Sequence, residues 1–259
     1  MKRPILRYFG GKFRLANWIV EHLGEHKVYV EPFGGAASVL MKKPRSYAEV
    51  YNDLNDDLYF LFKTLADPKK HLQLKKMIEA TPFARREFEM AHVYHPEPIE
   101  KARRLIVRSF MGFGADSATR LESKTGFRAN SNRSGTTPAH DWINWPQYIP
   151  EFYERLKGVV IECKDALEVM KTHDSDRTVF YVDPPYSTQT RRGNRYQHEM
   201  DDFDHVRLIN FLKTLQGRVV LSGYDAEFYG DNLIGWQKHT KEALADKAGK
   251  RIECLWIKQ

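Results

Sequence analysis

The residues of this chain with the clearest chemical potential are Asp183-Pro184-Pro185-Tyr186, which follow the apolar run 178–182. That run is rich in β-branched and aromatic side chains, so it predicts a buried β-strand. The two prolines fix φ and carry no N–H donor, and the strand therefore has to end before them. Asp183 would lie where a parallel strand stops, which is where α/β proteins bind their ligands.

This corner matches the needs of an amino group on a planar ring. The carboxylate of Asp183 and the carbonyl of Pro184 are two acceptors held close by stiff backbone, and an exocyclic amine carries two N–H donors. Tyr186 offers a flat face on which a base can stack. The alternative to a binding site is an ordinary strand that ends at two prolines, next to a surface aspartate. These four residues alone do not separate the two interpretations.

Two glycine-containing segments near the N-terminus could hold a ligand at such a corner. The first, Tyr8-Phe9-Gly10-Gly11-Lys12, precedes a predicted helix at 13–23. Its glycines let the backbone fold closely around a ligand. Lys12 could hold an anionic group such as a carboxylate or a phosphate, and a solvated lysine is the alternative.

The second segment predicts a strand at 28–30, a turn at Glu31-Pro32-Phe33-Gly34-Gly35 and then a helix. Such a turn brings backbone N–H groups and a helix N-terminus near a bound nucleoside. A further strand ends at Asp53, about twenty residues past the turn, the spacing at which a carboxylate meets ribose hydroxyls. No P-loop sequence is present, which disfavours nucleotide triphosphate hydrolysis, so the pattern predicts an adenosine-like cofactor.

Composition is that of a globular protein with a basic excess. The 259 residues are enough for one large domain or two small ones, and the net charge is +7. A basic excess suggests a polyanionic partner, although solubility alone would also explain it.

The cysteines, histidines and apolar runs of the sequence indicate whether the protein has disulfides, a metal site or a membrane segment. Cys163 and Cys254 lie far apart in apolar settings, which predicts buried free thiols in a reducing cytoplasm. The spacing of His92 and His95 does not match a zinc pair, and we expect no metal. No apolar run approaches membrane-span length, so we expect no signal peptide and no transmembrane helix.

From about residue 58 to residue 148 the alternation of strands and helices stops. Helical patterns occupy 58–65, 72–79, 82–92 and 99–111. A stretch rich in glycine, asparagine and arginine follows, which could form a hairpin or loop that enters a DNA groove, or a flexible surface loop. A second arginine-rich loop lies at 187–200. The candidates for DNA contact are Arg104, Arg108, Lys124, Arg128, Asn130, Asn132, Arg133, Arg191, Arg192 and Arg195.

The C-terminal third returns to alternating elements. A strand at 159–162 ends near Asp165, a helix is expected at 203–215, and strands are expected at 218–224 and 253–257. Strand–helix halves around a helical insertion predict an α/β domain with a mainly parallel sheet.

These motifs occur in the order seen in the Dam-like, D12-class DNA adenine-N6 methyltransferases, and the sequence resembles that family over most of its length. Asp183-Pro184-Pro185-Tyr186 is the most specific part of the resemblance. Two positions differ from the family pattern, because Tyr8 stands where tryptophan is frequent and Ala37 where glycine is frequent.

The resemblance implies a Rossmann-like methyltransferase sheet formed by residues 1–57 and 146–259, with a mainly helical target-recognition insertion at 58–145. It implies S-adenosylmethionine as the cofactor and the N6 amino group of a flipped adenine in double-stranded DNA as the methyl acceptor. We expect a monomer in the cytoplasm of a bacterial or phage-infected cell. The implied catalytic residues are Asp183, Pro184, Pro185 and Tyr186. The implied cofactor-binding residues are Tyr8, Gly10, Gly11, Lys12, Glu31, Pro32, Phe33, Gly34, Gly35, Asp53, Asp165 and Asp183.

Several alternatives stay open at the level of sequence. Asp165 could cap a helix instead of lying near the cofactor's adenine. The same corner could serve a methyltransferase that acts on RNA adenine or on cytosine N4, or belong to a DNA-binding relative that has lost catalysis. An oxidoreductase that uses a nicotinamide cofactor is a more distant alternative.

Overall fold

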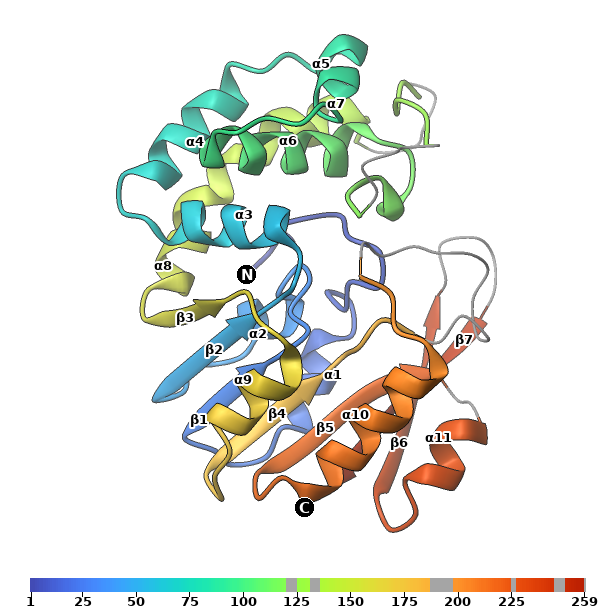
Figure 1. Cartoon of the computed structure of the whole chain (residues 1–259). Helices are drawn as coiled ribbons and strands as arrows, with labels where there is room; N and C mark the ends of the chain where they lie inside the picture. Colours follow the sequence, from blue (N-terminus) through green and yellow to red (C-terminus); the bar gives the residue numbers. More distant parts are fainter. Residues whose placement is uncertain (120–124, 131–135, 187–197, 225–226, 245–249, 259) are drawn as a thin grey trace. The chain divides into compact units, whose positions relative to one another are not determined.

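The computed structural model describes residues 1–119, 125–130, 136–186, 198–224, 227–244 and 250–258. The chain divides into two compact units (Figure 1). The helical unit contains Met1–Gly11 and the described residues of Asn55–Lys157. The sheet unit contains Lys12–Leu54 and the described residues from Gly158 to Lys258.

The sheet unit is built on seven strands in the order β3-β2-β1-β4-β5-β7-β6. The first five strands in this order are parallel, whereas β7 pairs antiparallel with both β5 and β6. The predicted mainly parallel α/β sheet is confirmed. The expected strand at 253–257 is part of β7, whose antiparallel direction and pairing with β6 the sequence pattern did not indicate. The strands are β1 (Val28–Glu31), β2 (Ala48–Asn52), β3 (Val159–Glu162), β4 (Thr178–Val182), β5 (Arg218–Tyr224), β6 (Gln237–Leu244) and β7 (Lys250–Lys258).

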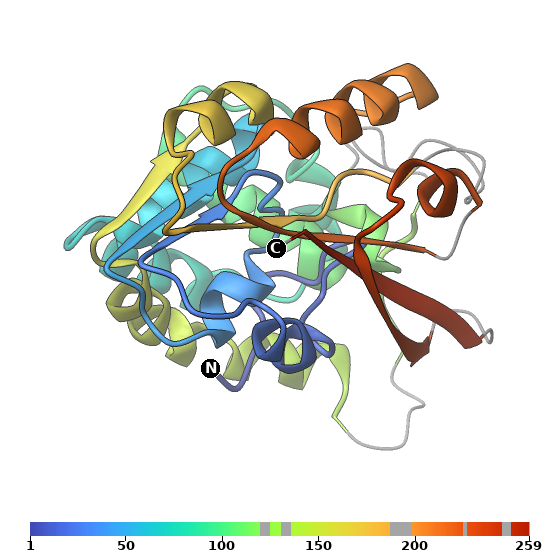
Figure 2. The ribbon, with the colours of Figure 1, turned by 90° about the horizontal axis from the view of Figure 1, so that it is seen from below.

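Helices cover both faces of this sheet. Val30, Phe180, Leu221 and Trp256 point to the face packed by α9 (Ala166–Thr172), α10 (Asp202–Thr214) and α11 (Glu227–Asn232). Figure 2 shows these helices on one side of the sheet and α1 (Ala16–Glu21) and α2 (Ser38–Lys42) on the other. Each fully buried aliphatic or aromatic side chain contributes about 1.5–3 kcal/mol. Because side chains alternate along a strand, Tyr181 and Asp183 face away from α9 and α10.

The helical unit is organised around α6 (Pro98–Met111), which contacts α3, α4, α5 and α7. Pro98 opens α6, where its missing N–H is not needed, and the side chain of Asn55 caps α3 by accepting from two backbone N–H groups. The predicted helical patterns of this segment are confirmed. The other helices are α3 (Asp56–Ala66), α4 (Lys70–Glu79), α5 (Arg85–Met90), α7 (Pro138–Asn144) and α8 (Ile149–Leu156).

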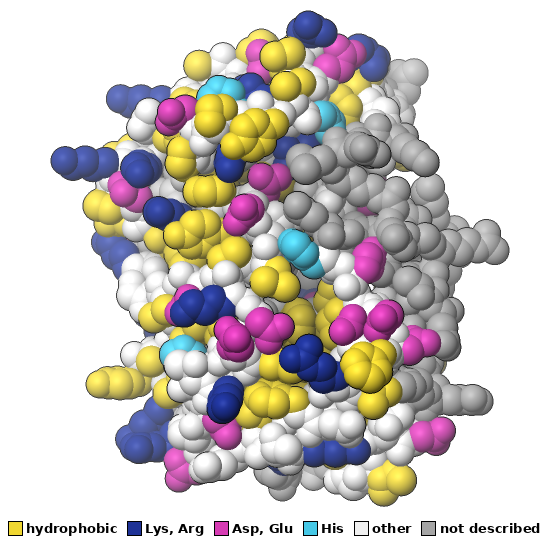
Figure 3. Space-filling view, in the orientation of Figure 1, with side chains coloured by type: hydrophobic (Ala, Val, Ile, Leu, Met, Phe, Trp, Pro, Cys, Tyr) yellow, Lys and Arg dark blue, Asp and Glu magenta, His cyan; other side chains and the backbone are white. Residues whose placement is uncertain are grey.

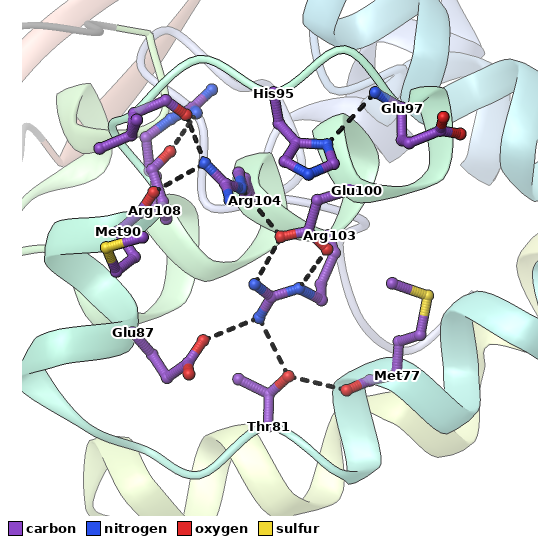
Figure 4. Close-up of polar contacts among 12 residues, drawn as sticks. Met77, Thr81, Glu87, Met90, His95, Glu97, Glu100, Arg103, Arg104 and Arg108 are labelled. Atoms are coloured by element: carbon purple, nitrogen blue, oxygen red, sulfur yellow. Dashed lines mark hydrogen bonds and ion pairs between the residues drawn. The ribbon is translucent and has the colours of Figure 1, made fainter.

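Arginines of α6 form a polar network that ties these helices together (Figure 4). Arg104 donates to Glu100 at 2.8 Å, and Arg108 donates to the carbonyl of Ala91 at 2.8 Å and pairs with Asp57 at 2.5 Å. Arg104 and Arg108 are only 8% and 3% exposed. Their guanidinium groups therefore hold the helical unit together, which differs from the DNA contact expected for them. From the sequence, Arg104 and Arg108 were expected on a charged, exposed face of the helix. Only the fold shows that other helices cover this face.

The backbone pairs like a hairpin at the end of α6. Phe113 N donates to Gly126 O at 2.9 Å and Arg128 N donates to Met111 O at 2.7 Å. These contacts close the glycine-, asparagine- and arginine-rich stretch at its base.

Both cysteines are free thiols. Cys254 is buried, as expected, whereas Cys163 is only half-buried. In the described part of the chain, none of the helices combines the length and apolarity needed to span a bilayer. The same residues include no group of three or more His, Cys, Asp or Glu side chains placed to hold a metal ion.

We expect Arg108→Met to lower the free energy of unfolding by about 2–4 kcal/mol, because it strands a partly buried Asp57 carboxylate and the Ala91 carbonyl. Arg86 is the matched control, since its guanidinium is 81% exposed and lies 3.5 Å from Glu89. Arg86→Ala should change stability by no more than about 0.5 kcal/mol. Urea titrations followed by circular dichroism measure both, and an Arg108→Met protein as stable as wild type would contradict this role.

Candidate active site

Asn52, the last residue of β2, ties together three strand ends at the carboxyl edge of the sheet. Its Nδ2 donates to Pro32 O at 2.9 Å and to Lys164 O at 3.0 Å, and its Oδ1 accepts from Lys164 N at 2.9 Å. The segments that follow β1, β2 and β3 are thereby fixed against one another, and ligands of α/β proteins bind at this edge. Asn52 belongs to no motif that the sequence shows; a lone amide at the end of an apolar strand was the available signal.

The glycine turn after β1 is packed against β2. Gly34 N donates to Asn52 O at 2.8 Å, and the hydroxyl of Tyr51 donates to Gly35 O at 2.7 Å. A Cβ on residue 34 would lie 2.1 Å from the Tyr51 ring, so only glycine fits there. Ala37 adopts φ 52°, a left-handed conformation that favours glycine.

The acids of this edge also support the turn. Asp53 Oδ2 accepts from Gly35 N at 2.8 Å. Glu31 is buried, and its Oε2 accepts from the Tyr29 hydroxyl at 2.9 Å and from Leu40 N at 3.1 Å. Both carboxylates therefore brace the turn and the start of α2. The cofactor contacts expected for them stay predictions.

Asp183 begins the corner after β4, as predicted, and Lys12 lies beside it. The Lys12 Nζ atom is 3.1 Å from Asp183 Oδ1 and 3.3 Å from Glu253 Oε1. The same ammonium lies 4.7 Å from the centre of the Tyr186 ring. Lys12 is 6% exposed, so its charge is shared between two carboxylates and an aromatic face rather than solvated.

Tyr186 is held by β5 and β7. Its hydroxyl donates to Glu253 Oε1, and the ring meets the edge of Tyr224 with centroids 4.5 Å apart. Tyr186 is only 6% exposed, in contrast to the exposed ring that we expected. The difference arises because the antiparallel strand β7, which carries Glu253, adds an acceptor that sequence order does not reveal.

Burial sets the protonation of this cluster. It raises the pKa of Asp183 to about 6, against the effect of Lys12, while the charge of Glu253 raises it further. The pKa of Tyr181 is also raised, by its burial and by the nearby Asp183. Asp183 therefore titrates close to neutrality, which is frequent for groups that take part in chemistry.

The remaining cofactor candidates have different surroundings. Asp165 is exposed and caps α9, accepting from Leu167 N at 2.9 Å and Glu168 N at 3.3 Å, which is the alternative left open for it. Phe33 packs on the apolar core of the sheet unit. Tyr8, Gly10 and Gly11 belong to the helical unit, where Gly11 N donates to Tyr8 O at 3.1 Å. Their cofactor contact stays a prediction.

Two of the other candidates for DNA contact are described: Arg128 is half-buried and Asn130 is exposed. On the face in Figure 3, basic side chains of the described residues are interspersed with acidic ones. The net positive charge is thus not gathered into one band on that described surface. Lys124, Asn132, Arg133, Arg191, Arg192 and Arg195 lie outside the described residues.

The parallel sheet with its glycine turn, and the Asp-Pro-Pro-Tyr corner at its carboxyl edge, define a Rossmann-like methyltransferase. The sequence model of the D12 class N6 adenine-specific DNA methyltransferases matches residues 8–244, and the chain belongs to this family. It is an enzyme that methylates adenine N6 in DNA.

Similar proteins carry the name DNA adenine methylase. The one from Vibrio cholerae serotype O1 is 27% identical over 237 residues, covering 86% of this chain and 82% of the relative. The one from Haemophilus influenzae is 26% identical over 249 residues, covering 87% and 81%. The one from Escherichia coli K12 is 23% identical over 225 residues, covering 84% and 77%.

We expect Gly34→Ala to destabilise the chain by about 1–3 kcal/mol, because the new methyl group has to displace the Tyr51 ring. Gly230 in α11 is the control, since a Cβ there meets nothing within 4 Å. Gly230→Ala should be neutral or should stabilise by up to about 1 kcal/mol. Equal unfolding midpoints of the two variants in urea would show that the turn is not tightly packed.

Proposed function

We propose that the methyl donor of this enzyme is S-adenosylmethionine and that its substrate is an adenine flipped out of double-stranded DNA, in the cytoplasm of a bacterial or phage-infected cell. We further propose that the chain acts as a monomer in which residues 58–145 recognise the target. The observation that carries the proposal is the half-buried Asp183 carboxylate, with its raised pKa, directly before the Pro184 carbonyl.

The chemical difficulty is the weak nucleophilicity of adenine N6, whose lone pair is delocalised into the ring. If Asp183 and the Pro184 carbonyl accept the two N–H bonds, they favour a pyramidal nitrogen and stabilise the positive charge that develops on it. The nitrogen gains a methyl group and has to lose one proton. Asp183, with a pKa of about 6, is placed to accept that proton before it passes to solvent.

The residues at this edge fit a positively charged methyl donor. S-adenosylmethionine supplies an electrophilic methyl group on a sulfonium ion. Glu31, Asp183 and Glu253 lie on one face of the sheet, and the ammonium of Lys12 pairs with two of these three carboxylates. This excess of negative charge favours a cation. We propose that Gly34, Gly35 and Asp53 hold the nucleoside end of the cofactor, as the glycine turn of nucleotide-binding folds does.

The structure changes the role that we propose for Lys12. The sequence suggested that it holds an anionic end of the cofactor, whereas its ammonium pairs with Asp183 and Glu253. We propose that Lys12 keeps Asp183 ionised at neutral pH.

A duplex adenine has to leave the base stack to reach this corner. Flipping costs a few kcal/mol, which contacts with DNA phosphates offset. We propose that Arg128, Asn130 and the arginine-rich segments around them supply part of these contacts. We propose that the base stacks on the Tyr186 ring, which Glu253 and Tyr224 hold in place.

We expect Asp183→Asn to lower kcat by at least about 10²-fold, because one acceptor and its charge are lost where charge develops. Cofactor affinity, measured by calorimetry with S-adenosylmethionine, should change far less. Asp176 is the control, since its side chain is 85% exposed and it precedes the amino end of β4. Asp176→Asn should keep the wild-type rate of methyl transfer to duplex DNA, and a similarly active Asp183→Asn enzyme would sink the proposed mechanism.

We expect kcat/KM to fall about tenfold per pH unit below pH 6, because protonated Asp183 has lost the negative charge that stabilises the developing positive charge and can no longer accept the proton. The variant Lys12→Met tests the role of the lysine in this profile. Because Lys12 lowers the pKa of Asp183, the variant should have a higher Asp183 pKa, and its acid limb, the fall of kcat/KM on the acid side, should begin at higher pH. The acid limb of the pH profile is located by measuring rates at limiting DNA and saturating cofactor between about pH 5 and about pH 8. A limb that stays in place or moves to lower pH in Lys12→Met would contradict the proposed role of the lysine.

A further inference from the structure

Glu253 on β7 lies on the same face of the sheet as the Asp-Pro-Pro-Tyr corner. Strand pairing sets Glu253 opposite Tyr224 and Leu255 opposite Ser222, so these four side chains share a face. Glu253 is 4% exposed. A buried carboxylate is costly unless charges and donors surround it, so its partners indicate its role.

Three donors from three segments of the sheet unit converge on one oxygen of Glu253. Oε1 accepts from the Tyr186 hydroxyl, lies 3.3 Å from Lys12 Nζ and accepts from Ser222 Oγ at 3.4 Å. Hydrogen bonds to a charged acceptor are about twice as strong as neutral ones. Glu253 is therefore connected to both halves of the corner, to the ring directly and to Asp183 through Lys12.

We propose that Glu253 is a positioning residue for methyl transfer: its carboxylate fixes the ring of Tyr186 and holds the ammonium of Lys12 between itself and Asp183. This inference rests on the proposed function, because there the ring and the Asp183 carboxylate receive the target base. Glu253 itself does not touch the base.

The first consequence concerns the ring. A hydrogen bond at the hydroxyl fixes the far end of the tyrosine, while Tyr224 at 4.5 Å and Lys12 at 4.7 Å limit its rotation. The incoming base then meets a preorganised surface and does not have to order it. Loss of Glu253 should reduce the rate through loss of this order.

The second consequence concerns charge. The groups that face Asp183 are Lys12, Glu253 on β7, Tyr181 on β4, Tyr229 on α11 and Tyr186. Glu253 shares the ammonium and adds a negative charge, and both effects make Asp183 a stronger base. Replacing Glu253 by glutamine should leave the ammonium to Asp183 alone and lower the pKa of Asp183.

Two variants separate these consequences. Glu253→Gln keeps size and an acceptor oxygen but removes the charge, so the acid limb of kcat/KM should move to lower pH, opposite to the shift expected for Lys12→Met. A residue that only stabilises the fold would not move the limb. Glu242→Gln, an exposed glutamate on the neighbouring strand β6, is the control and should have the wild-type limb.

A double-mutant cycle tests the link to the ring. We expect Tyr186→Phe and Glu253→Ala each to lower kcat by about tenfold or more, and the double variant to lose no more than the worse single variant. Glu253→Asp keeps the charge but has a shorter side chain. The acid limb of its kcat/KM profile should stay at the wild-type pH, whereas its kcat should still fall. It also serves if Glu253→Gln does not fold, as judged by thermal melts.

The outcomes distinguish this inference from the function on which it rests. Three results would overturn the role of Glu253 and leave the methyltransferase function intact. They are an unshifted acid limb in folded Glu253→Gln, losses in kcat that multiply in the double variant, and a wild-type kcat in Glu253→Asp. A wild-type chain that transfers no methyl group from S-adenosylmethionine to DNA adenine would instead overturn the proposed function.

Discussion

A carboxylate taken out of water at the end of a parallel strand needs a cation and hydrogen-bond donors close by, and this requirement organises the site. Asp183 is 17% exposed, and the ammonium of Lys12 lies 3.1 Å from its Oδ1 atom. The ammonium is shared with Glu253, so it does not fully neutralise Asp183. The outcome is an acid with a pKa of about 6, basic enough to accept donors and ionised at neutral pH. If Lys12 paired with Asp183 alone, the ion pair would be more stable and the Asp183 carboxylate would be a weaker hydrogen-bond acceptor.

The rest of the sheet unit holds this carboxylate in place. Two prolines end β4 directly after it, and the amide of Asn52 fixes the neighbouring strand ends. The turn at Gly34 is pressed against Tyr51 so closely that a methyl group does not fit. These are rigid contacts, and rigidity is what a weak nucleophile requires, because much of the rate then comes from the alignment of the reacting atoms.

Local patterns were sufficient to predict the parallel strands, the helices of the middle segment and the end of β4 at Asp183. Each depends on hydrophobic period, prolines or glycines within a few residues. Pairings between distant segments were beyond such patterns. Glu253 meets Tyr186 across 67 residues of sequence, on a strand whose antiparallel direction only the sheet reveals.

Burial was the second property that the sequence could not supply. Arg108 looked like a surface cation on an amphipathic helix, yet it is 3% exposed and pairs with Asp57. Tyr186 looked like an open ring and is instead anchored at its hydroxyl. In both cases a polar tip on a large side chain fits inside the protein because one matching partner exists there, and that partner is defined by tertiary structure.

In the proposed function, the corner presents adenine N6 to a methyl group from S-adenosylmethionine. The most direct measurement is mass spectrometry of nucleosides from duplex DNA incubated with the protein and with cofactor that carries a trideuterated methyl group. We expect the labelled product to be N6-methyl-2′-deoxyadenosine that carries the trideuterated methyl group. Label on cytosine N4, label on RNA adenine in preference to DNA, or no label in any nucleoside would contradict it.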